Sequence, residues 1–136
     1  MNSIIDYYGY KIPKNIKNVT IINQEHLPTN AFCNCSMITN ITLPENLKTI
    51  HNLAFYKCKD LITTFTGSVN QWAQIKFEDN PIEYSSKFYV GTSILSQIDW
   101  SNESIEVSRG AFYKCSSLTK VIIGKNIKFK EIDTDN

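Results

Sequence analysis

The sequence predicts a repeat solenoid, built mostly from short parallel β-strands and loops with short helical turns. Three observations predict it. The string Ala-Phe-x-x-Cys occurs three times, an aliphatic residue follows three positions after each Cys, and apolar residues then recur at strand-like spacing. The copies occupy residues 31–35, 54–58 and 111–115. Matching strings with a matching continuation indicate an internal repeat.

The segment that follows each copy has the spacing of a short strand with one buried face. In the first unit, Ile41 and Leu43 alternate around Thr42. In the last unit, Val121 and Ile123 hold the same positions, so these aliphatic side chains are expected to face the core. One such coil cannot bury enough apolar surface to offset its ordering entropy, and therefore the coils must stack and share a core.

The side chains of the repeated string suit this stacking. Ala is small where the coil turns tightly, Phe fills the core, and Cys acts as a compact buried hydrophobe. We therefore expect Phe32, Phe55 and Phe112 to lie along a common column. Cys35 and Cys58 should lie about 5 Å apart on adjacent coils, and we expect both thiols to be reduced because the sequence gives no sign of export.

The 57-residue interval between the second and third copies holds more than one additional unit. Residues 68–73 are predicted to form a short helical turn held by Trp72. Residues 75–77 and 88–90 are alternative candidates for the additional strand. The strand after Cys58 has two registers, because strict spacing turns Thr64 and Thr66 inward, whereas a shift by one residue turns Phe65 inward. We favour the register with Phe65 inward.

These patterns divide the chain into three parts. Residues 1–17 are predicted to cap the first coil, since end coils expose an apolar edge. The apolar and aromatic residues suited to that cap are Ile4, Ile5, Tyr7, Tyr8, Tyr10 and Ile12. Residues 18–130 form a solenoid of about five coils with an irregular insert near 67–93. Residues 131–136 are polar and are predicted to fray.

Over roughly residues 18–129, the units resemble the leucine-rich repeats of the BspA type. The pattern of that family is similar to A-F-x-x-C-x-x-L-x-x-I-x-I-P-x-x-V-x-x-I. Its first half is matched by Cys58-x-x-Leu61 and Cys115-x-x-Leu118, and its second half by the stretch ITLPENLKTI at residues 41–50. The resemblance implies a leucine-rich-repeat solenoid, which is a binding architecture used on many targets.

Composition narrows the class of function. A hydrophobic fraction of 42% and a charged fraction of 20% indicate a globular chain, and 14 basic against 13 acidic residues give a net charge of +1. That balance argues against a nucleic-acid partner. No apolar run approaches the roughly 18 residues of a membrane-spanning helix, and the first residues lack the features of a secretory signal. We therefore expect a cytoplasmic monomer that contacts another protein and no membrane.

Motifs for catalysis are missing from the sequence. It contains no phosphate-binding glycine loop, no H-E-x-x-H and no G-x-S-x-G, so we expect neither enzymatic activity nor a cofactor. Glu78-Asp79, beside Asn80-Pro81, is predicted to lie in a solvated turn rather than in an acid/base site.

Metal binding is not predicted either. His26 and His51 have no neighbouring ligand pattern and are predicted to be surface or turn histidines. Cys33-x-Cys35 lacks the second cysteine pair that a metal site would need. The repeat explains Cys35, and Cys33 is predicted to be buried or inert.

The candidate partner-binding residues are those expected to point outward from the strands. They are mixed polar residues with one exposed aliphatic, a composition closer to a protein-recognition surface than to a small-molecule pocket. They are Thr20, Asn40, Thr42, Gln97, Asp99, Lys120 and Ile122. Charge is also uneven, because residues 77–107 hold six acids and one base whereas residues 108–130 hold six bases and no acid. A negative middle and a positive end would suit a charge-complementary partner, although simple solubility explains the distribution equally well.

Three functional hypotheses follow. The first is a non-enzymatic interaction module that binds a macromolecule through its strand face and charged flank. The second is a soluble inhibitor, carried by a phage or mobile element, of a host enzyme such as a defence nuclease, in an anti-CRISPR-like role. The third is a fragment of a bacterial surface adhesin, which would require an export signal.

Overall fold

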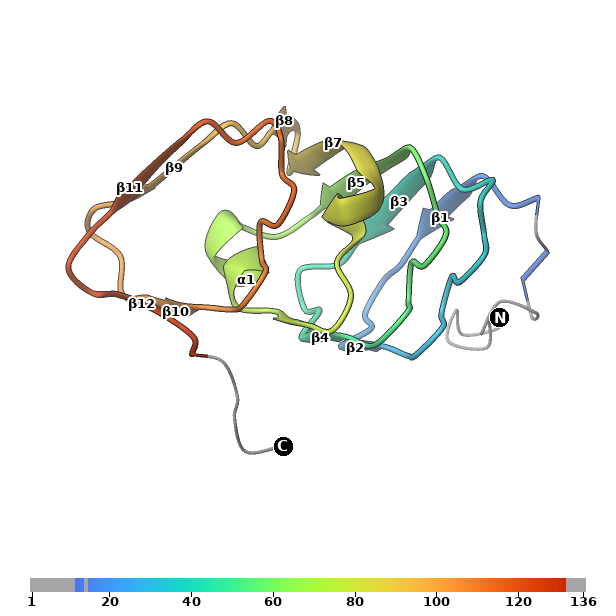
Figure 1. Cartoon of the computed structure of the whole chain (residues 1–136), viewed down its shortest axis with the longest axis horizontal. Coiled ribbons are helices and arrows are strands. Elements are labelled where there is room, and N and C mark those ends of the chain that lie inside the picture. The colour runs from blue at the N-terminus through green and yellow to red at the C-terminus, as the bar shows by residue number, and fades with distance from the viewer. Residues whose placement is uncertain (1–11, 14, 132–136) are drawn as a thin grey trace.

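The structure is a computed structural model, and it describes residues 12–13 and 15–131. Most of the residues predicted to form the N-terminal cap, and residues 132–136 of the predicted frayed tail, lie outside this range. Within it, the chain winds into a β-solenoid of about five coils that succeed one another along the long axis of the molecule (Figure 1). Ile12 and Ile16 pack against the core, half-buried, at the N-terminal end.

One side of the solenoid is formed by a five-stranded sheet and a two-stranded sheet. The first has the strand order β1 (Asn18–Thr20), β3 (Asn40–Leu43), β5 (Leu61–Phe65), β7 (Ser85–Val90), β8 (Ser93–Ile94). Its first four strands are parallel, and β8 turns back antiparallel to β7. The second sheet pairs β9 (Gln97–Trp100) with β11 (Lys120–Ile123) in parallel.

The opposite side consists of shorter strands. β2 (His26–Leu27), β4 (Thr49–Ile50) and β6 (Lys76–Phe77) form one parallel sheet, and β10 (Ile105–Val107) pairs with β12 (Ile127–Phe129) in another. The predicted solenoid with short parallel strands is therefore confirmed.

The Ala-Phe-x-x-Cys strings form the turns that close the coils. Phe32 and Phe55 are fully buried and their rings stack with centroids 5.7 Å apart. The amide of Phe32 donates to the carbonyl of Ala54 across 2.6 Å, which locks the two turns together. Phe112 is half-buried against the same core, and its ring lies 6.1 Å from that of Trp100. The expected column is thus shown directly for the first two rings.

The irregular insert contains both of the alternative strands. Residues 88–90 belong to β7 on one side of the solenoid, and Lys76–Phe77 is β6 on the other side. The predicted helical turn is α1 (Val69–Ala73), which begins with a capping box made by Ser68 and Gln71. Trp72 is fully buried and anchors this helix in the core, as predicted.

The register of β5 is the favoured one. Phe65 and Thr63 are fully buried, whereas Thr64 is half-buried and Thr66 is exposed. Phe65 lies beside Leu43 in the sheet, and Thr63 lies beside Ile41. The hydroxyl of the buried Thr63 is satisfied by the hydroxyl of Ser85 at 2.8 Å.

The last coil is less buried than the coils before it. Val121 and Ile123 are in register with the buried Ile98 and Trp100, but they remain 40% and 55% exposed. Their direction toward the core is as predicted, but they are only partly covered because, among the described residues, no further strand lies on the outer side of β11.

Candidate interaction surface

Side chains that point outward from β1, β3, β5 and β7 form two rows across the sheet. Strand register places Asn18, Asn40, Ile62 and Lys87 in one row, and Thr20, Thr42, Thr64 and Tyr89 in the other. We call these eight residues the outer sheet face. The amide of Asn40 donates to the side-chain oxygen of Asn18 across 2.9 Å, which holds one end of the first row in place.

The seven predicted site residues fall into two groups. Thr20, Asn40 and Thr42 lie on the outer sheet face, where Thr20 is directly beside Thr42. The other four lie on the separate β9–β11 sheet, where Gln97 is opposite Lys120 and Asp99 is opposite Ile122. All are exposed except Thr42, which is half-buried.

Sequence reasoning missed the four members of the outer sheet face that β5 and β7 contribute. They are Ile62, Thr64, Lys87 and Tyr89. Alternation in β5 identifies its outward residues only once the register is fixed, and β7 had to be chosen over another candidate strand. Pairing between the two strands supplies that information.

A hollow of about 410 Å³ opens beside the row of threonines. It is lined by Thr20, Thr42 and Thr66 together with residues of the loops that follow β1 and β3: Ile21, Ile22, Asn23, Pro44, Glu45 and Asn46. Ile22 is 69% exposed, although it is a large aliphatic residue. We call this region the threonine hollow. An exposed aliphatic residue beside polar hydroxyl groups is a composition found at protein interfaces.

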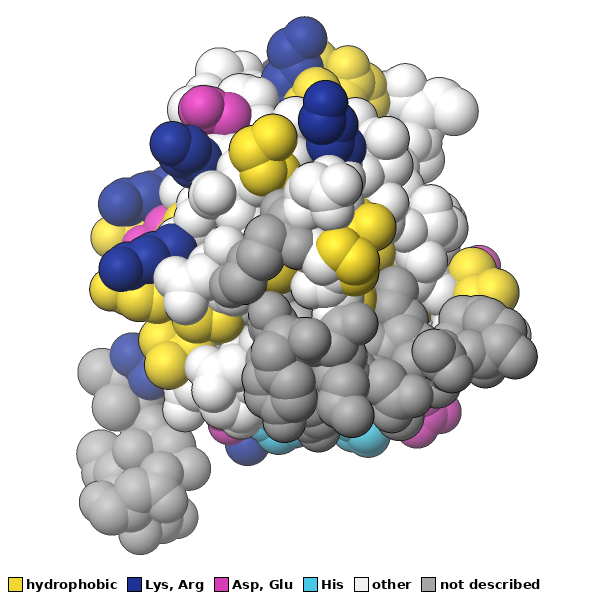
Figure 2. Space-filling view, turned by 90° about the vertical axis from the view of Figure 1, so that its right-hand side faces the viewer, with side chains coloured by type: hydrophobic (Ala, Val, Ile, Leu, Met, Phe, Trp, Pro, Cys, Tyr) yellow, Lys and Arg dark blue, Asp and Glu magenta, His cyan; other side chains and the backbone are white. Residues whose placement is uncertain are grey.

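A second exposed surface is formed by the turns. In two copies of the repeated string, a lysine lies over the ring of the preceding tyrosine, with 5.7 Å from Lys57 Nζ to the Tyr56 centroid and 5.4 Å from Lys114 Nζ to the Tyr113 centroid. Tyr56 and Tyr113 are 44% and 56% exposed. Figure 2, which views the N-terminal end, shows basic side chains gathered along one margin of the molecule with hydrophobic side chains between them.

The uneven charge of the sequence becomes a set of neighbouring opposite charges. Glu106 lies opposite Lys128 in the β10–β12 pair, and Lys114 Nζ is 3.9 Å from Glu83 Oε1. The hydroxyl and amide of Ser101 both donate to Asp99 and lower the pKa of its exposed carboxyl group. The acidic and basic segments therefore lie on adjacent coils.

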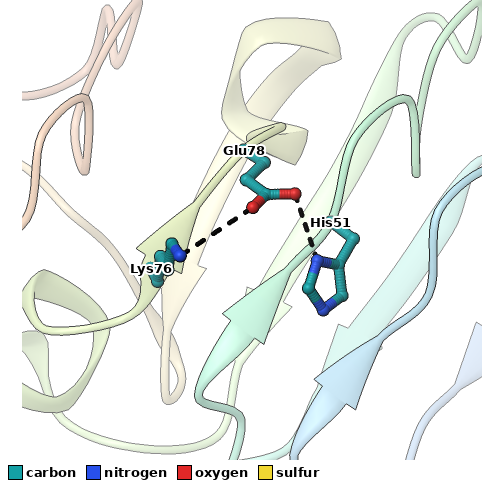
Figure 3. Close-up of polar contacts among 3 residues, drawn as sticks. All are labelled: His51, Lys76 and Glu78. Carbon is teal, nitrogen blue, oxygen red and sulfur yellow. Dashed lines mark hydrogen bonds and ion pairs between the residues drawn. The ribbon is translucent and has the colours of Figure 1, made fainter. Parts of the chain in front are cut away.

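The two histidines lie in a row of polar side chains on the side of the solenoid formed by β2, β4 and β6. His51 Nδ1 lies 3.1 Å from Glu78 Oε1, and Lys76 Nζ lies 4.0 Å from Glu78 Oε2 (Figure 3). The ring of His26 is 6.5 Å from that of His51 on the neighbouring coil. The predicted surface positions are confirmed, but the contact of His51 with Glu78, which lies 27 residues away, was not predicted. The part of the chain that the structure describes contains no group of three or more His, Cys, Asp or Glu side chains that could hold a metal ion.

Glu78-Asp79, beside Asn80-Pro81, was predicted to lie in a solvated turn; Glu78 is exposed, but for Asp79 and Asn80 the prediction was wrong. Asp79 accepts hydrogen bonds from the amide of Phe55 at 2.8 Å and from the hydroxyl of Tyr84 at 3.1 Å. Burial raises the pKa of Tyr84 well above its usual range, and the nearby negative charge of the Asp79 carboxylate raises it further. Asn80 is buried at the start of the 3₁₀ helix η2 (Pro81–Tyr84) and donates to the carbonyl of Ala111 at 3.1 Å. These side chains join the turn of the second repeated string to that of the third, where the insert interrupts backbone contact.

None of the four cysteines forms a disulfide. Cys35 and Cys58 are buried, and Cys33 is half-buried. Cys58 Sγ donates to the carbonyl of Phe32 at 3.3 Å, and burial raises the pKa of this thiol to about 12. A thiol that stays protonated is a poor nucleophile, so Cys58 has the properties of a core residue.

No helix in the described ranges is long and apolar enough to cross a membrane.

Comparison with known families agrees with this architecture. The family described as BspA type leucine rich repeat region (6 copies) matches residues 3–129. The chain therefore belongs to the BspA-type leucine-rich repeat family, and such a repeat solenoid is a protein-interaction architecture. The match also extends into the segment that was predicted to be a separate cap. Searches among curated proteins and among solved structures gave no match.

Proposed function

We propose that this chain is a non-enzymatic recognition module that binds a macromolecular partner through the outer sheet face and the threonine hollow. The observation that carries the proposal is the exposed Ile22 beside the hollow that Thr20 and Thr42 line. An apolar residue within a polar, solvent-accessible rim matches the anatomy of a binding surface.

The solenoid supplies rigidity to this surface. Hydrogen bonds between neighbouring coils fix the strands, and the core beneath them is a continuous cluster of buried side chains. A partner would thus dock on a preformed template, which reduces the entropy lost on binding. The mixed polar rows offer directional hydrogen bonds, and a threonine hydroxyl costs less free energy to desolvate than a charged group does.

Affinity capture from a lysate of the source cells, with matched variants, tests this proposal. The variant I22E/T42K changes the hollow, whereas M37E adds a charge at another exposed position, where Met37 is 47% exposed. A partner of this surface should be retained by the wild-type chain and by M37E, and the double variant should bind it about tenfold more weakly.

The identity of the captured molecule separates the hypotheses. One stoichiometric enzyme that loses activity on binding would favour an inhibitor, and extracellular matrix proteins would favour an adhesin. Equal capture by I22E/T42K and the wild type would contradict the proposed surface. Turnover of a substrate by the chain would contradict a purely binding role.

A further inference from the structure

The last described coil exposes a strand edge and apolar side chains together. Among the described residues, β11 pairs only with β9, and β12 pairs only with β10. We call these two strands the C-terminal edge. The inward positions of β9 are nearly fully buried, with Ile98 and Trp100 at 4% and 3% exposure, whereas their partners Val121 and Ile123 are 40% and 55% exposed. The last coil is therefore covered on the side of β9 and exposed on its other side.

This edge has the properties of a binding site for another strand. Unpaired backbone groups along β11 can form a further ladder, which is how extended peptides bind to sheet edges. Ile122 and Phe129 add exposed apolar surface at 39% and 53%. Large exposed apolar side chains beside an unpaired strand edge indicate an interaction site.

The charges on the edge indicate the chemistry of the occupant. Residues 108–130 hold six basic residues and no acidic residue. On the inner side, the strands that already pair with this coil carry acids, since Glu106 lies opposite Lys128 and Asp99 lies two positions from Gln97, which is opposite Lys120. β9 and β10 thus show which sequence pattern fits this coil: apolar residues that point inward, alternating with acidic or uncharged polar residues that point outward.

A second copy of the chain does not fit this pattern. Two C-terminal edges placed together would join strands that carry Lys120 and Lys128 but no acid, and like charges across an interface are unfavourable. At the other end of the solenoid, β1 (Asn18–Thr20) carries no acid and follows Lys17.

We propose that the C-terminal edge binds an extended acidic segment of another protein, which adds to β11 and β12 as further parallel strands. This site is separate from the outer sheet face, so its test is independent of the test of the function proposed above. Backbone hydrogen bonds along the edge strands supply affinity without sequence preference. Val121 and Ile123 contact apolar side chains of the segment, and Lys120 and Lys128 select acidic residues.

A synthetic peptide with the sequence of residues 95–107 is the probe, because this segment already pairs with β11 and β12 and carries three acids and no base. It would be titrated to millimolar concentration into the isotope-labelled chain and followed by NMR. Saturable shifts should occur in Lys120–Ile123 and Ile127–Phe129. A peptide in which its three acids are replaced by lysine should not bind.

Charge exchange provides the decisive comparison. K120E/K128E should weaken binding of the acidic peptide about tenfold and restore binding of the lysine peptide. K57E/K59E has the same change in net charge on exposed residues outside the edge and should retain the affinity of the wild type. K120Q/K128Q, a milder change, should weaken binding to an intermediate degree.

Three results would overturn the proposal. One is the absence of shifts at the edge at millimolar peptide. Another is an equal loss of affinity in K57E/K59E, which would indicate nonspecific attraction. The third is self-association of the wild-type chain through the edge in sedimentation experiments, which would make a second copy the occupant.

Discussion

The indole nitrogen of Trp72 donates to the carbonyl oxygen of Ala111 across 2.8 Å. The two residues are 39 positions apart, one in the helix of the insert and the other in the last repeated string. The Trp72 ring also packs against Phe65, Phe77 and Phe88, with centroids 4.7 to 5.1 Å away. One side chain thus joins the coils on either side of the insert.

Replacing Trp72 should therefore destabilise the whole solenoid. Trp72→Phe removes the hydrogen bond and leaves a gap in the core, so the free energy of unfolding should fall by about 1–3 kcal/mol. The loss is limited because Asn80 Nδ2 still donates to the same carbonyl. Urea denaturation measures the change. Tyr113→Phe, at a 56% exposed ring, is the control and should stay within about 0.5 kcal/mol of the wild type; equal effects of the two substitutions would contradict the role of Trp72.

Stability should decrease in alkaline solution because of Cys58. Its folded pKa is raised to about 12 from 9.0, so the folded state keeps the proton at pH values where the unfolded chain loses it. The stabilising contribution is complete below pH 9.0 and is lost as pH rises toward about 12, at up to about 1.4 kcal/mol per pH unit.

The unfolding free energies of the wild type and Cys58→Ala, measured by urea denaturation across this pH range, isolate that contribution. The variant should be less stable at neutral pH, and its stability should depend less on pH above 9.0, the ordinary pKa of the thiol. Parallel pH profiles of the two proteins would show that Cys58 ionises alike in both states.

Gly124 is required for the close approach of the last two coils. A Cβ atom at this position would lie 2.5 Å from the carbonyl oxygen of Ser101 and 2.7 Å from that of Trp100. Both obstacles are backbone atoms, so Gly124→Ala must push β11 away from β9. We expect a loss of about 1–3 kcal/mol and faster amide exchange in Lys120–Ile123.

Gly110→Ala is the matched control for that substitution. Its Cβ would meet no atom within 4 Å, and only the strained backbone at φ 70° acts against it. It should cost about 1 kcal/mol without loosening β11. A Gly124→Ala variant with unchanged exchange in β11 would contradict the close approach.

The sequence was sufficient to predict side-chain positions wherever the repeat is regular. Phe32 and Phe55 occupy equivalent positions in identical strings, and their stacked rings follow from that equivalence. Phe65 could also be placed by alternation, since only one register buries its ring. The outward positions of Thr20 and Asn40 follow from the same reasoning.

The insert could not be predicted in the same way, because its contacts have no repeated counterpart. Asp79 and Asn80 are polar residues next to a proline, a local pattern typical of solvated turns. Their partners, Phe55 and Ala111, are 24 and 31 residues away. The exposure of Val121 was missed for another reason: a repeat pattern fixes the direction of a side chain but not the presence of a neighbouring strand.

The central claim is that successive coils stack in parallel and in register over one core. NMR measurement of nuclear Overhauser effects on the labelled chain tests it most directly. The account predicts backbone contacts from Ile41 to both Val19 and Thr63, and ring contacts between Phe32 and Phe55. Contacts confined within each segment, or an antiparallel pattern between β1 and β3, would contradict it.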